Sequence, residues 1–151
     1  RGSPENIQTL LAAGADVMAR TKTGRTPLHY AAVSNTTASV QILLTAGADV
    51  MARGGNGWTP LHWASSGGSY LNIETLLAAG ANVMARGGDD WTPLHWAASS
   101  GTSDNIEVLL AAGADAKAKS KDGKTPWDLA QENEEAEGTK GYWALNDAQY
   151  N

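Results

Sequence analysis

Short clusters of apolar residues return along the chain at a fixed interval, and each has the spacing of one helix face. Val40, Leu43 and Leu44 stand at positions i, i+3 and i+4, which bring side chains to the same side of an α-helix. The cluster recurs in steps of 33 residues, at Ile7/Leu10/Leu11, Ile73/Leu76/Leu77 and Ile106/Leu109/Leu110. The pattern predicts a series of short amphipathic helices, which need neighbours to bury their apolar faces.

A repeated Thr-Pro pair predicts a second series of helices. Thr26, Thr59 and Thr92 are each followed by proline; threonine caps a helix start, and proline suits the first helical position. We expect these helices over 27–34, 60–66 and 93–100. Small or polar residues, such as Asn35-Thr36, separate each of them from the next apolar cluster, so the chain is a succession of helix pairs.

A glycine and a turn follow each apolar cluster. Glycine at this place commonly takes the left-handed conformation that ends a helix, and it occurs at Gly14, Gly47, Gly80 and Gly113. Two residues later stands Asp or Asn, whose side chain is expected to hydrogen-bond its own backbone two residues on. These residues are Asp16, Asp49, Asn82 and Asp115.

Two sequence motifs therefore recur with the same period of 33 residues. Thr-Pro-Leu-His begins at residues 26, 59 and 92, and a variant, Thr125-Pro126-Trp127-Asp128, keeps the step of 33 but loses the Leu-His pair. A 33-residue period with T-P-L-H-x-A is the signature of the ankyrin repeat, and the chain resembles that family. The resemblance implies an all-α solenoid with short β-hairpin fingers, in about four and a half repeats. Fingers and first helices would form a concave surface.

On this resemblance we expect one ankyrin repeat domain over residues 1–151. It divides into a partial N-terminal repeat (1–22), full repeats (23–55, 56–88 and 89–121) and a C-terminal capping repeat (122–151). The first unit begins at its second helix, which suggests a fragment of a longer solenoid. The last unit has an acidic run over 131–137 and a predicted helix over 139–149. A solvated capping face is the favoured interpretation of the acidic run, and a docking patch for a basic partner is the alternative.

Composition and charge narrow the classes of function. A hydrophobic content of 42% and a charged content of 18% are typical of a folded chain. The net charge of −5 argues against a nucleic-acid partner. No apolar run approaches the roughly 20 residues of a membrane span, and no signal peptide opens the sequence. We expect a cytoplasmic monomer that binds no membrane and, having no cysteine, has no thiol chemistry.

The repeated polar and sulfur-containing residues do not form a reactive site. His29, His62 and His95 occur once per repeat, on the order of 10 Å apart, and cannot converge on one zinc ion. The resemblance implies that each bonds the motif threonine and backbone instead. Repeated Met18, Met51 and Met84 are interpreted as packing residues. Because no catalytic motif is found, we expect no enzyme activity, no metal and no cofactor.

Candidate partner-binding residues lie at positions that vary between units. The resemblance places the finger tips, the residue before the motif threonine and the ends of the first helices on the concave side. Aromatic residues and arginine are favoured at interface hot spots, whereas Trp63 and Trp96 are expected mainly to pack. The candidates are Lys22, Arg25, Asn56, Trp58, Ser66, Asp89, Trp91, Ser99, Asp122 and Lys124.

These residues favour a non-catalytic module that binds a protein or peptide on the concave surface. Three alternatives stay open. The tryptophan-lined face could bind a small molecule or sugar, or the chain could be a regulatory fragment of a larger protein. An engineered binding scaffold is also compatible, although Ala38-Ser39 and Tyr70-Leu71 break the regularity of the units.

Overall fold

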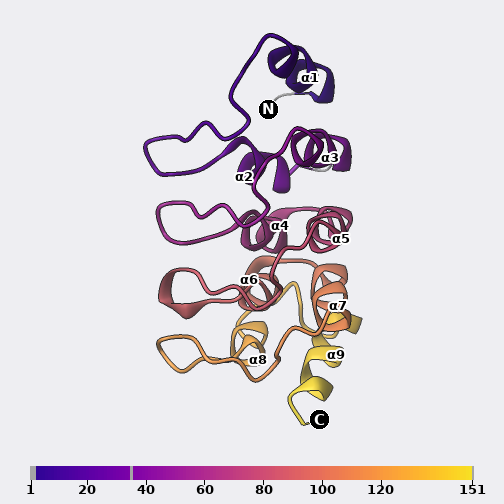
Figure 1. The fold of residues 1–151 in the computed structure, drawn as a ribbon. Helices are drawn as coiled ribbons and strands as arrows, with labels where there is room; N and C mark the ends of the chain where they lie inside the picture. The colour runs from indigo at the N-terminus through magenta and orange to yellow at the C-terminus, as the bar shows by residue number, and fades with distance from the viewer. Residues whose placement is uncertain (1–2, 35, 151) are drawn as a thin grey trace.

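The computed structural model describes residues 3–34 and 36–150. Its helices form two columns, and long loops project from one side (Figure 1). The column nearer the loops holds the first helices, α2 (Pro27–Ala32), α4 (Pro60–Gly67), α6 (Pro93–Ser100) and α8 (Pro126–Ala130). The other column holds the second helices, α1 (Pro4–Ala12), α3 (Thr37–Thr45), α5 (Tyr70–Ala78), α7 (Ser103–Ala111) and α9 (Lys140–Ala148).

The loops that precede α2, α4, α6 and α8 lie one above another (Figure 1), and we call them fingers. Each first helix contacts the next first helix and its own second helix, and each second helix contacts the next second helix. Helix α1 packs on α3, and it has no buried residue. Its apolar face is therefore only partly covered, and Leu10 is 60% exposed.

Most predicted helix ends agree with the structure to within two residues. The helix expected over 27–34 ends at Ala32, because the hydroxyl of Ser34 donates a 2.7 Å hydrogen bond to the Ala31 carbonyl and competes with the helical ladder. The predicted break there includes Asn35, which lies outside the described residues. The last helix is Lys140–Ala148, capped by the side chain of Thr139.

The hydrophobic core lies between the two columns and continues from repeat to repeat. In the apolar clusters of α3, α5 and α7 the first two residues, such as Ile73 and Leu76, are buried. The third residue, such as Leu77, is only partly buried at the edge of the core. The first helices contribute Leu28, Leu61 and Leu94, each with no exposed area.

The expected β-hairpins are not seen, since no strand occurs within residues 3–34 and 36–150. Each finger is closed at its base by one backbone hydrogen bond, for example from Gly54 N–H to the Trp58 carbonyl at 2.9 Å, and a turn bond lies inside it, here from Gly57 N–H to the Gly54 carbonyl at 2.8 Å. A β-ladder needs successive bonds of this kind. In the second finger the guanidinium of Arg53 donates to the Gly57 carbonyl. A side chain therefore occupies a backbone acceptor near the turn that a β-ladder would pair with a backbone N–H group.

Arginine and methionine side chains join neighbouring fingers. Arg53 Nη1 also donates to the carbonyl of Arg86 at 3.0 Å, and Arg20 and Arg86 make equivalent bonds to Arg53 and Lys119. The sulfurs of Met18, Met51 and Met84 accept backbone N–H groups of the following repeat at 3.2, 3.3 and 3.2 Å. The methionines therefore do more than fill space: they are weak acceptors across each repeat boundary.

We predict that Leu76→Ala lowers the free energy of unfolding by about 2–5 kcal/mol, because it leaves a cavity in the buried row between α5 and its neighbours. Leu77→Ala is the matched control, and its smaller effect reflects a side chain that is already partly exposed. Urea denaturation followed by circular dichroism measures both. Equal losses in the two variants would contradict the assigned position of the core.

Candidate functional site

A row of tryptophans and one arginine runs along the surface between the fingers and the first helices. Trp63 projects from α4 and Trp96 from α6, while Trp58 stands at the base of a finger, directly before the capping threonine. The ring centroid of Trp58 lies 6.5 Å from that of Trp63 and 4.6 Å from that of Trp96. Trp91 continues the row, 4.8 Å from Trp96.

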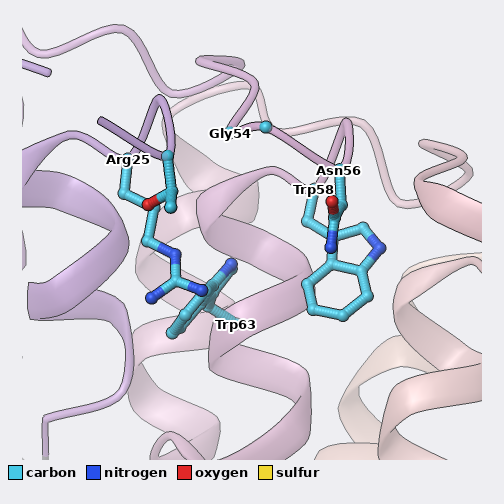
Figure 2. Close-up of a pocket in the computed structure, with 7 residues that line it drawn as sticks. Arg25, Gly54, Asn56, Trp58 and Trp63 are labelled. Carbon is cyan, nitrogen blue, oxygen red and sulfur yellow. The ribbon is translucent and has the colours of Figure 1, made fainter. Parts of the chain in front are cut away.

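Arg25 takes the place of a ring at the start of this row. Its guanidinium carbon lies 4.4 Å from the ring centroid of Trp63, within the range of a cation–π interaction. Figure 2 shows the guanidinium beside the Trp63 ring, with Trp58 on the other side of it. We call Arg25, Trp58, Trp63, Trp91 and Trp96 the aromatic row.

The structure does not separate binding tryptophans from packing tryptophans as the sequence analysis expected. All four rings of the aromatic row are partly buried. The indole N–H groups of Trp58 and Trp96 are buried without a hydrogen-bond partner, which is costly. Trp58 therefore contributes to packing as much as Trp96 does, and its exposed part is what a partner would meet.

Gly87 is what allows Trp58 to lie against the next finger. A Cβ atom added at Gly87 would stand 2.1 Å from Cδ1 of Trp58, far inside contact distance. Glycine pairs lie in the second and third fingers, at 54–55 and 87–88, and Gly87 permits the close approach of a ring. In the sequence, the feature that points to this contact is the step of 33 residues that separates both Trp58 from Trp91 and Gly54 from Gly87.

A pocket of about 280 Å³ opens on the aromatic row. Its lining is mostly apolar, and it consists of Val33, Trp58, His62, Trp63, Ser66, Gly67 and Trp96. A smaller hollow of about 80 Å³ adjoins it on the finger side, lined by Arg25 and the second finger as well as by Trp58 and Trp63. The two hollows therefore share two tryptophans.

The other predicted site residues surround this pocket at varying distances along the stack. The finger-tip residues are all exposed, namely Lys22, Asn56, Asp89 and Asp122. Ser66 lines the pocket, and its hydroxyl lies 3.3 Å from that of Ser100. Ser99 is partly buried at the end of α6.

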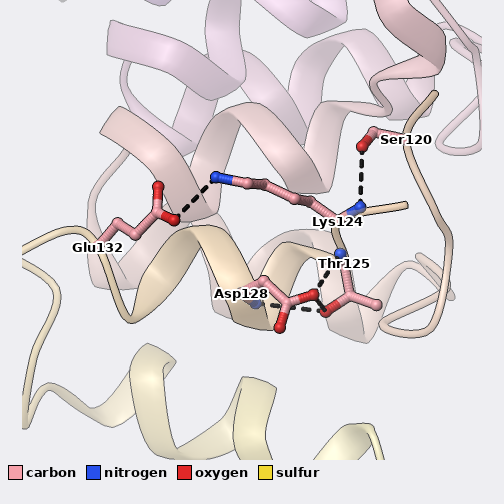
Figure 3. A network of polar contacts seen from close by, with 5 residues as sticks. All are labelled: Ser120, Lys124, Thr125, Asp128 and Glu132. Carbon is pink, nitrogen blue, oxygen red and sulfur yellow. Dashed lines mark hydrogen bonds and ion pairs between the residues drawn. The ribbon is translucent and has the colours of Figure 1, made fainter. Parts of the chain in front are cut away.

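Lys124, in the phase of Arg25, makes an ion pair instead of stacking on a ring. Its ammonium lies 2.8 Å from a carboxylate oxygen of Glu132 (Figure 3). Next to it, Asp128 replaces the motif histidine and accepts hydrogen bonds from the N–H and hydroxyl of Thr125 at 2.8 Å each. These bonds hold the pKa of Asp128 below its usual value. Glu132 belongs to the acidic run, which is therefore partly engaged within the chain.

The tip of the third finger has an unusual backbone. Asp89 and Asp90 both adopt positive φ, at 57° and 59°, whereas Gly57 occupies the position equivalent to Asp90 in the preceding finger. Positive φ disfavours residues other than glycine, although Asp tolerates it better than most. The strain presents two carboxylates at one exposed tip.

The motif histidines are structural, as the family resemblance implied. Nδ1 of His62 accepts the backbone N–H of Thr59 at 3.1 Å, so Nε2 carries the proton and donates to the Trp91 carbonyl at 3.0 Å. His29 and His95 make the equivalent bonds, to the carbonyls of Trp58 and Lys124. Burial lowers the pKa of His62 to about 4, and it also lowers the pKa values of His29 and His95.

The described part of the chain contains no group of three or more His, Cys, Asp or Glu side chains that could hold a metal ion. None of its helices is long and apolar enough to cross a membrane. The predicted Asx turns are confirmed, because Asp16, Asp49, Asn82 and Asp115 each accept the backbone N–H two residues on.

Comparison with known protein families gives two matches. Residues 1–87, more than half of the chain, match a family described as ankyrin repeats (3 copies), and residues 76–130 match ankyrin repeats (many copies). The chain belongs to the ankyrin repeat family. No curated protein matches it. Ankyrin repeats are generally protein–protein interaction modules without catalytic activity, and nothing in this ankyrin stack indicates catalysis.

We predict that Gly87→Ala displaces the Trp58 ring and lowers the free energy of unfolding by about 1–3 kcal/mol, the usual cost of overpacking. Gly67→Ala is the matched control, because a Cβ there meets nothing within 4 Å. Denaturation curves give the stabilities, and near-ultraviolet circular dichroism reports the tryptophan environment. Equal stabilities and equal near-ultraviolet spectra in the two variants would contradict the close packing of Trp58 on Gly87.

We predict that acidification destabilises the stack through its histidines. Their folded pKa values lie below the unfolded value of 6.5, so the unfolded chain binds protons first as the pH falls. The stability contribution is complete above about pH 6.5 and is lost between that value and the folded pKa. For His62 alone the loss between pH 7 and pH 5 is about 2 kcal/mol.

Urea denaturation at pH 7 and pH 5 measures this loss, above the range where most carboxylates titrate. Imidazole NMR signals of the folded protein provide the control, since His62 should remain neutral at pH 5. Identical midpoints at the two pH values would contradict the assignment.

Proposed function

We propose that this ankyrin stack is a non-catalytic module that binds a protein or peptide on the concave surface formed by its fingers and first helices. The supporting observation is the apolar pocket of about 280 Å³ bounded by Trp58, Trp63 and Trp96. Exposed polar finger tips such as Asn56 and Asp89 stand beside it. An apolar centre with a polar rim is the usual composition of a protein interface.

The residues of the aromatic row favour a protein partner over a separate small molecule. The pocket volume of about 280 Å³ lies close to the lower end of the range of about 300–1,000 Å³ that is usual for drug-sized ligands, so its size does not decide between the two. Tryptophan and arginine are the side chains most enriched among interface hot spots. The small-molecule or sugar alternative therefore takes second place.

The ten predicted site residues enter this proposal unequally. Trp58, Trp91, Arg25 and Ser66 lie on or beside the aromatic row and form its centre. The finger tips and Ser99 form its rim. Lys124 contributes least, because its charge is already paired with Glu132. The repeat boundaries given above, a monomeric state and a cytoplasmic location belong to the same proposal.

We predict that Ser66→Arg lowers the affinity for the partner by tenfold or more, because a long charged side chain would fill the pocket. Gln41→Arg is the matched control, with the same change of charge at an exposed position on α3, in the column away from the fingers. Capture from source-cell lysate with both variants and the unmodified chain identifies the partner, and titration then gives the affinities. Equal capture by Ser66→Arg would remove the concave pocket from the binding surface.

A further inference from the structure

We infer that Arg25 and the tryptophan pocket together bind a protein segment that carries a carboxylate next to an apolar side chain. This inference rests on the proposed function and names the chemistry of the partner. It follows from an arginine that is held in place on the candidate binding surface while its hydrogen-bonding groups remain unused.

The guanidinium of Arg25 is fixed by stacking. It lies 4.4 Å from the centroid of the Trp63 ring, and the residue is partly buried. Within residues 3–34 and 36–150 the hydrogen bonds of Arg25 involve its backbone alone: its N–H donates to the Thr21 hydroxyl, and its carbonyl accepts the Thr21 N–H. The contact with the ring leaves the five N–H donors of the guanidinium without an oxygen acceptor among the described residues.

The neighbouring arginines show that this chain normally uses guanidinium donors. Arg20, Arg53 and Arg86 each donate from Nη1 to two carbonyls and join adjacent fingers. Lys124, at the position of Arg25 three repeats later, pairs with Glu132. Arg25 combines a restrained side chain with free donors, so little entropy is lost when a ligand binds it.

A carboxylate is the group that such an arginine binds best in a protein partner. Its two oxygens accept parallel N–H bonds from a guanidinium, and the charge makes them about twice as strong as neutral ones. The other residues around the small hollow beside Arg25 are uncharged, namely Thr23, Gly54, Gly55, Asn56, Trp58 and Trp63. Among the described residues, no carboxylate lines this hollow to compete for the guanidinium.

The apolar pocket fixes what must stand beside that carboxylate. Trp58 and Trp63 line both the hollow at Arg25 and the larger pocket, so the two sites adjoin. Consecutive residues of an extended segment advance about 3.3 Å. A segment with Asp or Glu within two positions of Leu, Ile, Met or Phe would therefore reach both sites.

A displayed library of random 12-residue peptides tests this, with three baits: the unmodified chain, Arg25→Gln and the control Lys117→Gln, which removes a positive charge at an exposed position outside the candidate site. We expect the unmodified chain and Lys117→Gln to enrich peptides with an acidic residue within two positions of an apolar one. Arg25→Gln should retain the apolar residue and lose the acidic preference. Its fold should persist, because the Arg25 side chain contributes a single ring contact.

A double-mutant cycle on one enriched peptide then tests the contact directly. Replacing its acidic residue by the amide should weaken binding about tenfold or more to the unmodified chain and hardly at all to Arg25→Gln. Peptides without an acidic preference, or an amide effect that survives in Arg25→Gln, would overturn the inference. The proposed function would stand in that case if Ser66→Arg abolished binding. If no peptide is enriched relative to a Ser66→Arg bait, the result contradicts both this inference and the proposed function.

Discussion

The hydrogen bond from each motif histidine to the next repeat is the interaction on which the rest of the stack depends. The imidazole of His62 is buried between Thr59, which it caps through Nδ1, and the Trp91 carbonyl, to which it donates through Nε2. One ring thereby sets the start of its own first helix and the base of the next finger. It must be neutral to do both, and burial ensures this by lowering its pKa.

This bond also positions the candidate binding residues. The accepting carbonyls belong to Trp58, Trp91 and Lys124, the residues directly before the capping threonines Thr59, Thr92 and Thr125. The backbone of each is held by the histidine of the preceding repeat, while its side chain differs from repeat to repeat. A solenoid can therefore change its recognition chemistry at this position without disturbing the bonds that stack it. Trp58 and Lys124 use one backbone arrangement for two different chemistries.

The regular part of the fold was predictable because periodic residues have periodic contacts. The Thr-Pro pairs, the helix-ending glycines and the Asx turns were all identified from one 33-residue step, and their hydrogen bonds are those expected. The fingers were less predictable, because their shape depends on Arg53 and on single backbone bonds rather than on strand propensity. The repeated arginines and methionines were visible in the sequence, but periodicity alone does not say that a sulfur accepts an N–H group.

The candidate site was only partly predictable, for a physical reason. Its residue types were found, but a tryptophan at a finger base can point to solvent or pack on its neighbour. The choice depends on a glycine 29 residues further along the chain, as Gly87 shows for Trp58. Once the rings are packed, they no longer act as separate contacts. They form a rigid surface. On the proposed function, the groups that distinguish one partner from another are the polar groups that the packing leaves without hydrogen-bond partners. In this stack the guanidinium of Arg25 is the clearest of these, because the ring that restrains it cannot accept its in-plane hydrogen bonds.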